Sequence, residues 1–200
     1  MKWLRGKIGW FALVAVLAGA LFFLFSKRER LDASRIPYSA VNDFDIILSQ
    51  GQSIESRIVR LLDINTQRSF SHAGIIIKNK GIIRVFHATP DGTKENCLRF
   101  DDLQTFFNLS NVCDCVILRC RDLTADQRAK LLSAFESYRY KIRPFNYKFD
   151  NTDQSKLYCT ELIWLIFNKA GIFSNHDFDL SKPIAPSDFL SCRKLRQILP

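Results

Sequence analysis

Cys159 is the residue of this sequence best placed to do chemistry. It lies in KLYCTELIW, where the apolar pattern predicts a helix over Leu157–Ala170 with the cysteine in its first turn. Unpaired backbone N–H groups and the positive end of the helix dipole favour a thiolate there, so we expect a nucleophile with a lowered pKa. The same N–H groups can bind a developing oxyanion. The alternative is a packing residue, because cysteine is among the most buried residue types.

A thiol nucleophile needs a base, and the chain has only three histidines. His72 begins a predicted strand in FSHAGII, and His87 lies near the end of the next one in RVFHATP. Neighbouring strands can place two rings side by side, so that one imidazole orients the other. The alternative for His72 is a hydrogen-bonded residue at a strand start. His176 lies in a polar loop, SNHDFD, where we expect it to be solvated.

Four further cysteines fall within a 24-residue window, namely Cys97, Cys113, Cys115 and Cys120. They lack the paired CxxC-like spacing of structural zinc sites, and no histidine lies near them after residue 97. We interpret them as core or disulfide cysteines. The sequence therefore predicts neither a metal site nor a cofactor.

The elements around these residues predict an α+β domain, a small antiparallel sheet packed on a central buried helix. The central helix is Leu157–Ala170, which is apolar nearly all round. Asn79-Lys80-Gly81 separates two strands as a hairpin loop, and Thr124 with Gln127 forms a capping box. The other predicted elements are strands at Asp45–Leu48, Ala73–Ile77, Ile82–His87 and Val116–Arg119 and helices at Ser53–Asp63 and Thr124–Arg139.

Five segments in order resemble the permuted papain-like members of the NlpC/P60 superfamily, and more closely the YiiX/YaeF-like cysteine amidases. The segments are FDIILSQGQSIESRIVRLLDINTQRSFSHAGIII, VFHATPDGT, PFNYKF, LYCTELIWLIF and IAPSDFL. In the permuted group the histidine strand precedes the cysteine helix, which is the order of His72, His87 and Cys159 here. The resemblance implies a circularly permuted papain-like fold.

The resemblance also implies roles for individual residues. Cys159 is similar to the family's nucleophile and His72 to its base. His87 occupies the third, orienting position, where we expect a glutamate in YiiX-like proteins. Tyr158 precedes the cysteine as in the family. Tyr147 in PFNYKF matches a family tyrosine that lines the site, so both tyrosines are candidate substrate or oxyanion residues.

The N-terminus predicts a membrane anchor. Residues 8–25 contain no charge and just suffice to span a hydrocarbon core of about 30 Å. The first 30 residues carry six basic side chains and one acidic one, more than half of the chain's net charge of +9. That distribution is typical of an anchor, and we see no nucleic-acid-binding motif. The alternative is a signal peptide cut after Ala20, which would leave an apolar new N-terminus.

We therefore expect an anchor over 1–26, a linker over 27–42 and a catalytic domain over 43–200. The domain is expected outside the cytoplasm, on a bacterial inner membrane. The expected function is a cysteine hydrolase acting on an amide or ester bond of a small acyl, amide or peptide substrate, which the nearby bilayer could supply as a lipid. There are three alternatives: a lipid-active acyltransferase or thioesterase relative, a pseudoenzyme, and a non-catalytic tethered binding domain. The lipid-active relatives typically carry the signature N-C-E-H at the nucleophile, and the YCTE of this chain lacks it.

Overall fold

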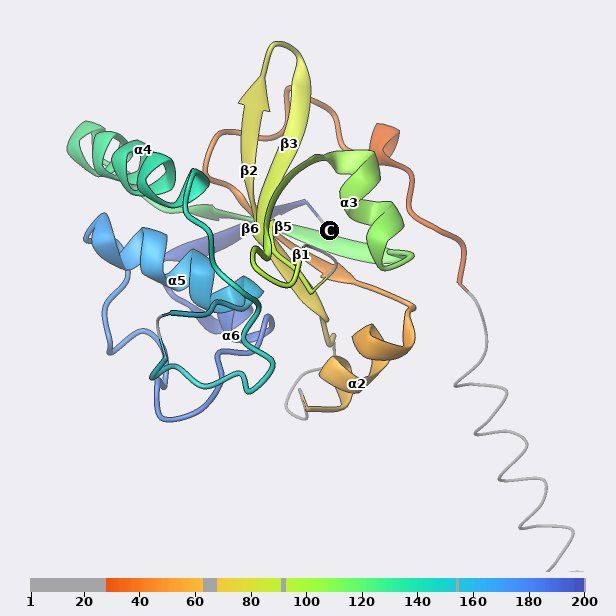
Figure 1. The fold of residues 1–200 in the computed structure, drawn as a ribbon. Helices are drawn as coiled ribbons and strands as arrows, with labels where there is room; N and C mark the ends of the chain where they lie inside the picture. Colours follow the sequence, from red (N-terminus) through yellow and green to blue (C-terminus); the bar gives the residue numbers. More distant parts are fainter. Residues whose placement is uncertain (1–27, 63–67, 91–92, 154, 200) are drawn as a thin grey trace, which may run out of the picture.

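The computed structural model describes residues 28–62, 68–90, 93–153 and 155–199. Its centre is a six-stranded, fully antiparallel sheet in the order β4-β3-β2-β1-β5-β6 (Figure 1). The strands are β1 (Ile46–Gln50), β2 (His72–Asn79), β3 (Ile82–Ala88), β4 (Leu98–Asp102), β5 (Asp114–Cys120) and β6 (Leu195–Leu199). This confirms the expected α+β class with an antiparallel sheet.

Helices cover both faces of the sheet (Figure 1). α4 (Ala125–Arg139) and α5 (Cys159–Lys169) pack on one face, where α5 contacts β2 and β3. α3 (Leu103–Leu109) packs on the other face with the short η1 (Ala33–Arg35). Alternate residues of each strand point to these two faces, so one core forms under α4 and α5 and another under α3. The remaining helices are α2 (Ile54–Leu62) and α6 (Asp188–Ser191).

Several local predictions are confirmed. β2 and β3 are joined by a two-residue turn in which Lys80 and Gly81 both have positive φ, 47° and 84°. That conformation matches the twist of a hairpin, and glycine adopts it without strain. The capping box of α4 is present: the Gln127 backbone N–H donates to the Thr124 side chain, and the Thr124 backbone N–H donates to the Gln127 side chain. The central helix is α5, which is largely buried as expected.

The segment predicted as a linker packs against the domain over its described residues. Ile36 and Val41 are buried in the core under α3. The Leu31 backbone N–H donates to the Val112 carbonyl oxygen, at 2.8 Å. No helix within the described ranges is long and apolar enough to cross a membrane. The predicted span over residues 8–25 lies outside those ranges.

Candidate active site

Cys159 lies in the first turn of α5, as the sequence predicted, although the helix begins at Cys159 itself and not at Leu157. The chain before it is held by a parallel bridge between Phe145 and Leu157, which fixes where the helix begins. Tyr158 is the N-cap, and its carbonyl oxygen accepts the backbone N–H of Leu162 at 3.0 Å. The side chain of Cys159 is therefore positioned by a regular helix start, and the residue is 7% exposed.

The electrostatics of the thiol differ from the expectation. Burial raises the pKa of Cys159 to about 11, although the backbone N–H groups of Ala73, Thr160 and Cys159 itself favour the thiolate. The prediction of a lowered pKa is therefore wrong for the free protein, because loss of hydration outweighs the helix start. A thiol with this pKa is protonated at neutral pH and needs a base to become a nucleophile.

His72 and His87 lie side by side on β2 and β3. The His72 Nε2 and His87 Nδ1 atoms are hydrogen-bonded at 2.9 Å, and the ring centroids are 5.0 Å apart. Gly74 allows this approach, since a Cβ there would lie 2.3 Å from Val85 Cγ1 and 3.3 Å from His87 Cβ. The glycine of the SHAGI segment is thus needed for the close packing of the two strands beneath the imidazoles.

Asp101, on β4, completes a chain of polar groups that sequence reasoning missed. His87 is fully buried, and its Nε2 lies 3.1 Å from Asp101 Oδ2. Arg99 binds both oxygens of the same carboxylate, at 2.8 and 3.0 Å. Burial opposes ionisation of Asp101, but the hydrogen bonds from His87 and Arg99 outweigh it and lower its pKa to about 2. The carboxylate is therefore ionised at neutral pH.

The ionised carboxylate fixes the tautomers of both imidazoles. Asp101 can only accept, so Nε2 of His87 carries a proton. In the neutral ring, His87 Nδ1 then accepts from Nε2–H of His72, which leaves Nδ1 of His72 unprotonated. Burial and the neighbouring His87 hold the pKa of His72 well below 6.5. His72 is thus a neutral imidazole with one free basic nitrogen at neutral pH.

The nucleophile candidate lies beside the backbone where β2 begins. The Ala73 N–H that favours the Cys159 thiolate belongs to the peptide group linking His72 to Ala73. The thiol therefore lies beside the backbone of His72. The His72 ring itself stacks on Phe106 of α3, with centroids 5.3 Å apart. In the described part of the chain no hydrogen bond joins Cys159 Sγ to the His72 ring; such bonds often tighten only when substrate is bound.

Comparison with known proteins identifies the family of the chain. The sequence profile of the family described as "Permuted papain-like amidase enzyme, YaeF/YiiX, C92 family" matches residues 41–199. The chain belongs to this permuted papain-like amidase family. A similar solved structure is that of the metalloprotein yiiX from Escherichia coli O157:H7, with a TM-score of 0.60 and 20% identity. That match covers 78% of this chain and 96% of the other. No curated protein matches the sequence significantly.

Tyr147 and Tyr158, the two candidate substrate or oxyanion residues of this family member, have different surroundings. Tyr158 is buried; its hydroxyl donates to Asn151 Oδ1 and accepts the Ile184 backbone N–H at 3.1 Å. Both bonds tie loops around the start of α5. Tyr147 is 70% exposed, and its ring contacts Phe145 with centroids 5.1 Å apart. Of the two hydroxyls, that of Tyr147 is the one available to a substrate.

Glu161 is a second buried polar residue that sequence reasoning missed, although it lies within YCTEL. It is in the first turn of α5 and 3% exposed, and its Oε2 atom is buried without a hydrogen-bond partner in the described part of the chain. Burial raises the pKa of Glu161 to about 8. A hydrogen bond from the Tyr158 backbone N–H opposes this shift, and the negative charges of Asp150 and Asp153 add to it. At neutral pH the carboxyl is mostly uncharged, so it places little negative charge beside the Cys159 thiol.

The remaining cysteines are free thiols. Cys97, Cys115, Cys120 and Cys192 are buried, and Cys113 is half-buried. The similar Escherichia coli protein is described as a metalloprotein. In the present chain, the described ranges contain no group of three or more histidine, cysteine, aspartate or glutamate side chains arranged to hold a metal ion. The residues described here therefore do not fit a resident metal.

Proposed function

We propose that this protein is a membrane-anchored cysteine hydrolase that cleaves an amide or ester bond through an acyl-enzyme on Cys159. The observation that supports it is the polar chain from His72 through His87 to Asp101, which leaves one basic nitrogen on His72, the residue whose backbone lies beside the Cys159 thiol. Membership of the amidase family supports the reaction class. Residues 8–25 would supply the anchor.

The first half-reaction follows from these protonation states. Cys159 Sγ attacks the carbonyl carbon while Nδ1 of His72 takes the thiol proton, so thiolate forms only as the new bond forms. The developing oxyanion accepts from the Cys159 backbone N–H at the start of α5, with the exposed Tyr147 hydroxyl as the second donor. His72 then protonates the departing amine or alcohol, and a thioester remains on Cys159.

The second half-reaction restores the enzyme. A water molecule attacks the thioester carbonyl while His72 accepts one of its protons, and Cys159 leaves with that proton as a thiol. The carboxylic acid is released. In both halves the imidazolium formed on His72 is stabilised through His87 by the ionised Asp101. Each proton transfer in these steps is assigned to a residue of the chain itself.

The test is labelling of the full-length protein with a thiol-directed acylating probe, together with hydrolysis of acyl ester and amide panels. We expect Cys159 to be the labelled residue and Cys159→Ala to abolish turnover. Cys113→Ala and Cys115→Ala are matched controls that should keep the chemistry, since Cys115 lies in β5 and Cys113 directly before it, not at the start of α5. Turnover that survives in Cys159→Ala would end the proposal.

A further inference from the structure

The segment that joins α4 to α5 exposes large apolar side chains next to basic ones. Tyr140, Ile142 and Tyr147 are 76%, 67% and 70% exposed, and all three fall within eight consecutive residues. Residues 138–149 also contain four basic side chains and no acidic one. This combination is typical of surfaces at a membrane interface, where aromatic rings lie at the level of the headgroups and basic side chains meet anionic lipids.

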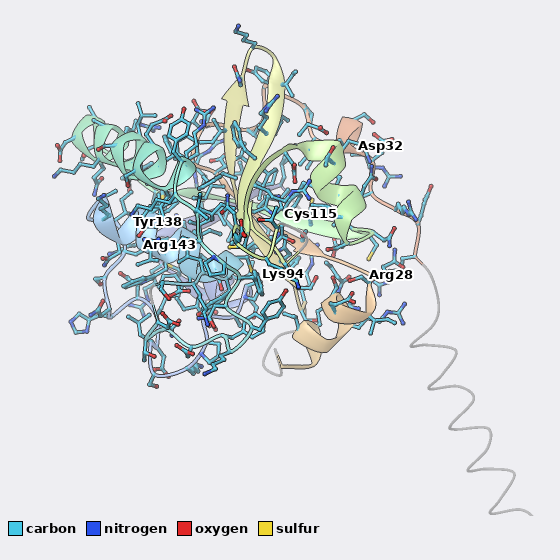
Figure 2. The ribbon with its side chains drawn as sticks, in the orientation of Figure 1. Arg28, Asp32, Lys94, Cys115, Tyr138 and Arg143 are labelled. Atoms are coloured by element: carbon cyan, nitrogen blue, oxygen red, sulfur yellow. The ribbon has the colours of Figure 1, made fainter. Side chains whose placement is uncertain are left out.

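Two of these basic side chains, Lys141 and Arg143, have no carboxylate partner in the described part of the chain. Lys141 Nζ lies 4.3 Å from the centroid of the Tyr138 ring, and Arg143 Nη1 donates to the carbonyl oxygen of Ile142 at 3.2 Å. Figure 2 shows Tyr138 and Arg143 beside each other at the end of α4. Both cations can therefore bind an anion without breaking an ion pair.

The segment is fixed to the residues that precede Cys159. The Asn146 backbone N–H donates to the Leu157 carbonyl oxygen at 2.9 Å, and the Leu157 N–H donates to the Pro144 carbonyl oxygen at 3.0 Å. A row of aromatic rings follows the same path from the surface to the start of α5, with successive centroids 5.1, 5.9 and 5.5 Å apart, formed by Tyr147, Phe145, Phe149 and Tyr158. A surface that binds this segment therefore also lies beside the start of α5.

The described chain begins at the same end of the sheet. Arg28 Nη1 donates to the side-chain oxygen of Gln50, the last residue of β1, at 3.3 Å. Because β1 and β2 are antiparallel, His72 begins β2 at this end, and its backbone lies beside Cys159. The apolar run over 8–25 ends three residues before Arg28, and three residues span at most about 11 Å. A bilayer that holds this run would therefore lie close to the end of the sheet that carries the segment.

We propose that residues 138–149 dock on the surface of an anionic bilayer, the membrane that residues 8–25 would enter. Tyr140 and Ile142 enter the interface, and the two unpaired cations bind lipid headgroups. The short connection to the apolar run favours a bilayer over a soluble acidic partner, since it holds the segment near lipid. The inference rests on the proposed function and adds the substrate class. With the segment docked, the start of α5 lies at the membrane, so the substrate is a membrane-resident acyl ester or amide.

The test places a nitrobenzoxadiazole fluorophore, which reports polarity, on the full-length protein reconstituted in vesicles. The reporter is attached through Ile142→Cys in a Cys113→Ala background, since the other native thiols are buried. Ile82→Cys is the matched control, because Ile82 is also exposed but lies at the opposite end of β3 from His87. When phosphatidylglycerol replaces part of the phosphatidylcholine, we expect the emission from position 142 to shift to shorter wavelength and that from position 82 to stay unchanged.

Charge variants test the contact with the headgroups. Lys141→Gln combined with Arg143→Gln should weaken docking about tenfold or more, since each basic residue near an anionic surface contributes about fivefold. Arg128→Gln combined with Lys130→Gln is the matched control, because it removes two exposed cations from α4, and it should leave the shift unchanged. Raising the salt concentration should reduce the shift in the wild-type background.

Three results would overturn the docking surface: no shift at position 142 with phosphatidylglycerol, an equal shift at position 82, or a shift that persists in the Lys141→Gln, Arg143→Gln variant. A shift that appears in phosphatidylcholine alone and grows with the ratio of protein to lipid would assign the surface to a second copy of the chain, which also overturns the proposal. The fluorophore reports docking without turnover. Hydrolysis of an ester by Cys159→Ala would instead overturn the hydrolase function, so the two failures are distinguishable.

Discussion

His87 is completely buried between His72 and Asp101, with its two ring nitrogens hydrogen-bonded at 2.9 and 3.1 Å. The three residues come from three adjacent strands, β2, β3 and β4. Because the ionised carboxylate of Asp101 can only accept hydrogen bonds, it fixes the tautomer of His87 and, through His87, leaves Nδ1 of His72 unprotonated. The arrangement assigns distinct tasks to the two histidines, and these can be separated by mutation.

We predict that His72→Ala is more damaging than His87→Ala. The first change removes the base and should lower kcat/KM by ~10²-fold or more, whereas the second removes only the group that orients the base. Single-turnover rates with an activated ester measure both. If the His87 variant were slower than the His72 variant, the two roles would be reversed.

Asp101→Asn tests the tautomer argument. The substitution keeps the size of the side chain but removes the charge that Arg99 and His87 share. An amide can present its NH₂ group to His87 Nε2, which permits the wrong tautomer and leaves His72 Nδ1 protonated. We expect a large fall in kcat with KM little changed. An Asp101→Asn enzyme with wild-type kcat would show that Asp101 is not part of the catalytic chain.

The pH profile follows from the shift of His72. Its pKa lies well below 6.5 because of burial and the adjacent His87, so the imidazole is free base throughout the neutral range. Activity is lost only when this ring is protonated, and the acidic limb of kcat/KM should therefore lie below pH 6.5. Measured on a neutral ester over pH 4–8, a limb centred at 6.5 or above would contradict the buried, neutral imidazole.

Glu161 predicts a pH dependence of stability. Its folded-state pKa, about 8, exceeds the ordinary value of 4.5, so the folded protein holds a proton that the unfolded chain has released between these two values. The free energy of unfolding should fall as pH rises through that window. Glu161→Gln removes the titration and should be more stable than the wild type at pH 8, with a smaller difference at pH 4.5.

Thermal unfolding of both proteins at the two pH values is the measurement. Glu161→Ala is the companion variant, because it removes the same titration but leaves a gap at the start of α5. It should lose stability at both pH values and lower kcat by displacing Cys159. A difference between wild type and Glu161→Gln that did not change with pH would show that the carboxyl is not held neutral.

The parts of the site predictable from the sequence are those set by local pattern. Gly81 in the hairpin loop, the apolar α5 and the strand positions of His72 and His87 all follow from residue type and spacing. The role of Asp101 does not follow from local pattern, because the segment LRFDD alternates too little between apolar and polar residues to predict a strand. Asp101 reaches His87 only because β4 pairs with β3, where His87 lies opposite Arg99. The raised pKa of Cys159 also depends on packing that no local pattern encodes.

The last prediction concerns the anchor. Deleting residues 1–27 should give a soluble, folded domain, because the contacts that hold the following segment begin at Arg28 with Gln52 and continue at Leu31 with Val112. The full-length protein should resist carbonate extraction from membranes, and release by carbonate would contradict the anchor. On vesicles that carry a long-chain acyl ester, it should outpace the 1–27 deletion, since anchoring raises the effective substrate concentration. On a soluble neutral ester, the full-length protein and the 1–27 deletion should have equal rates. A lower rate of the deletion on that ester would show that the deletion damages the catalytic domain.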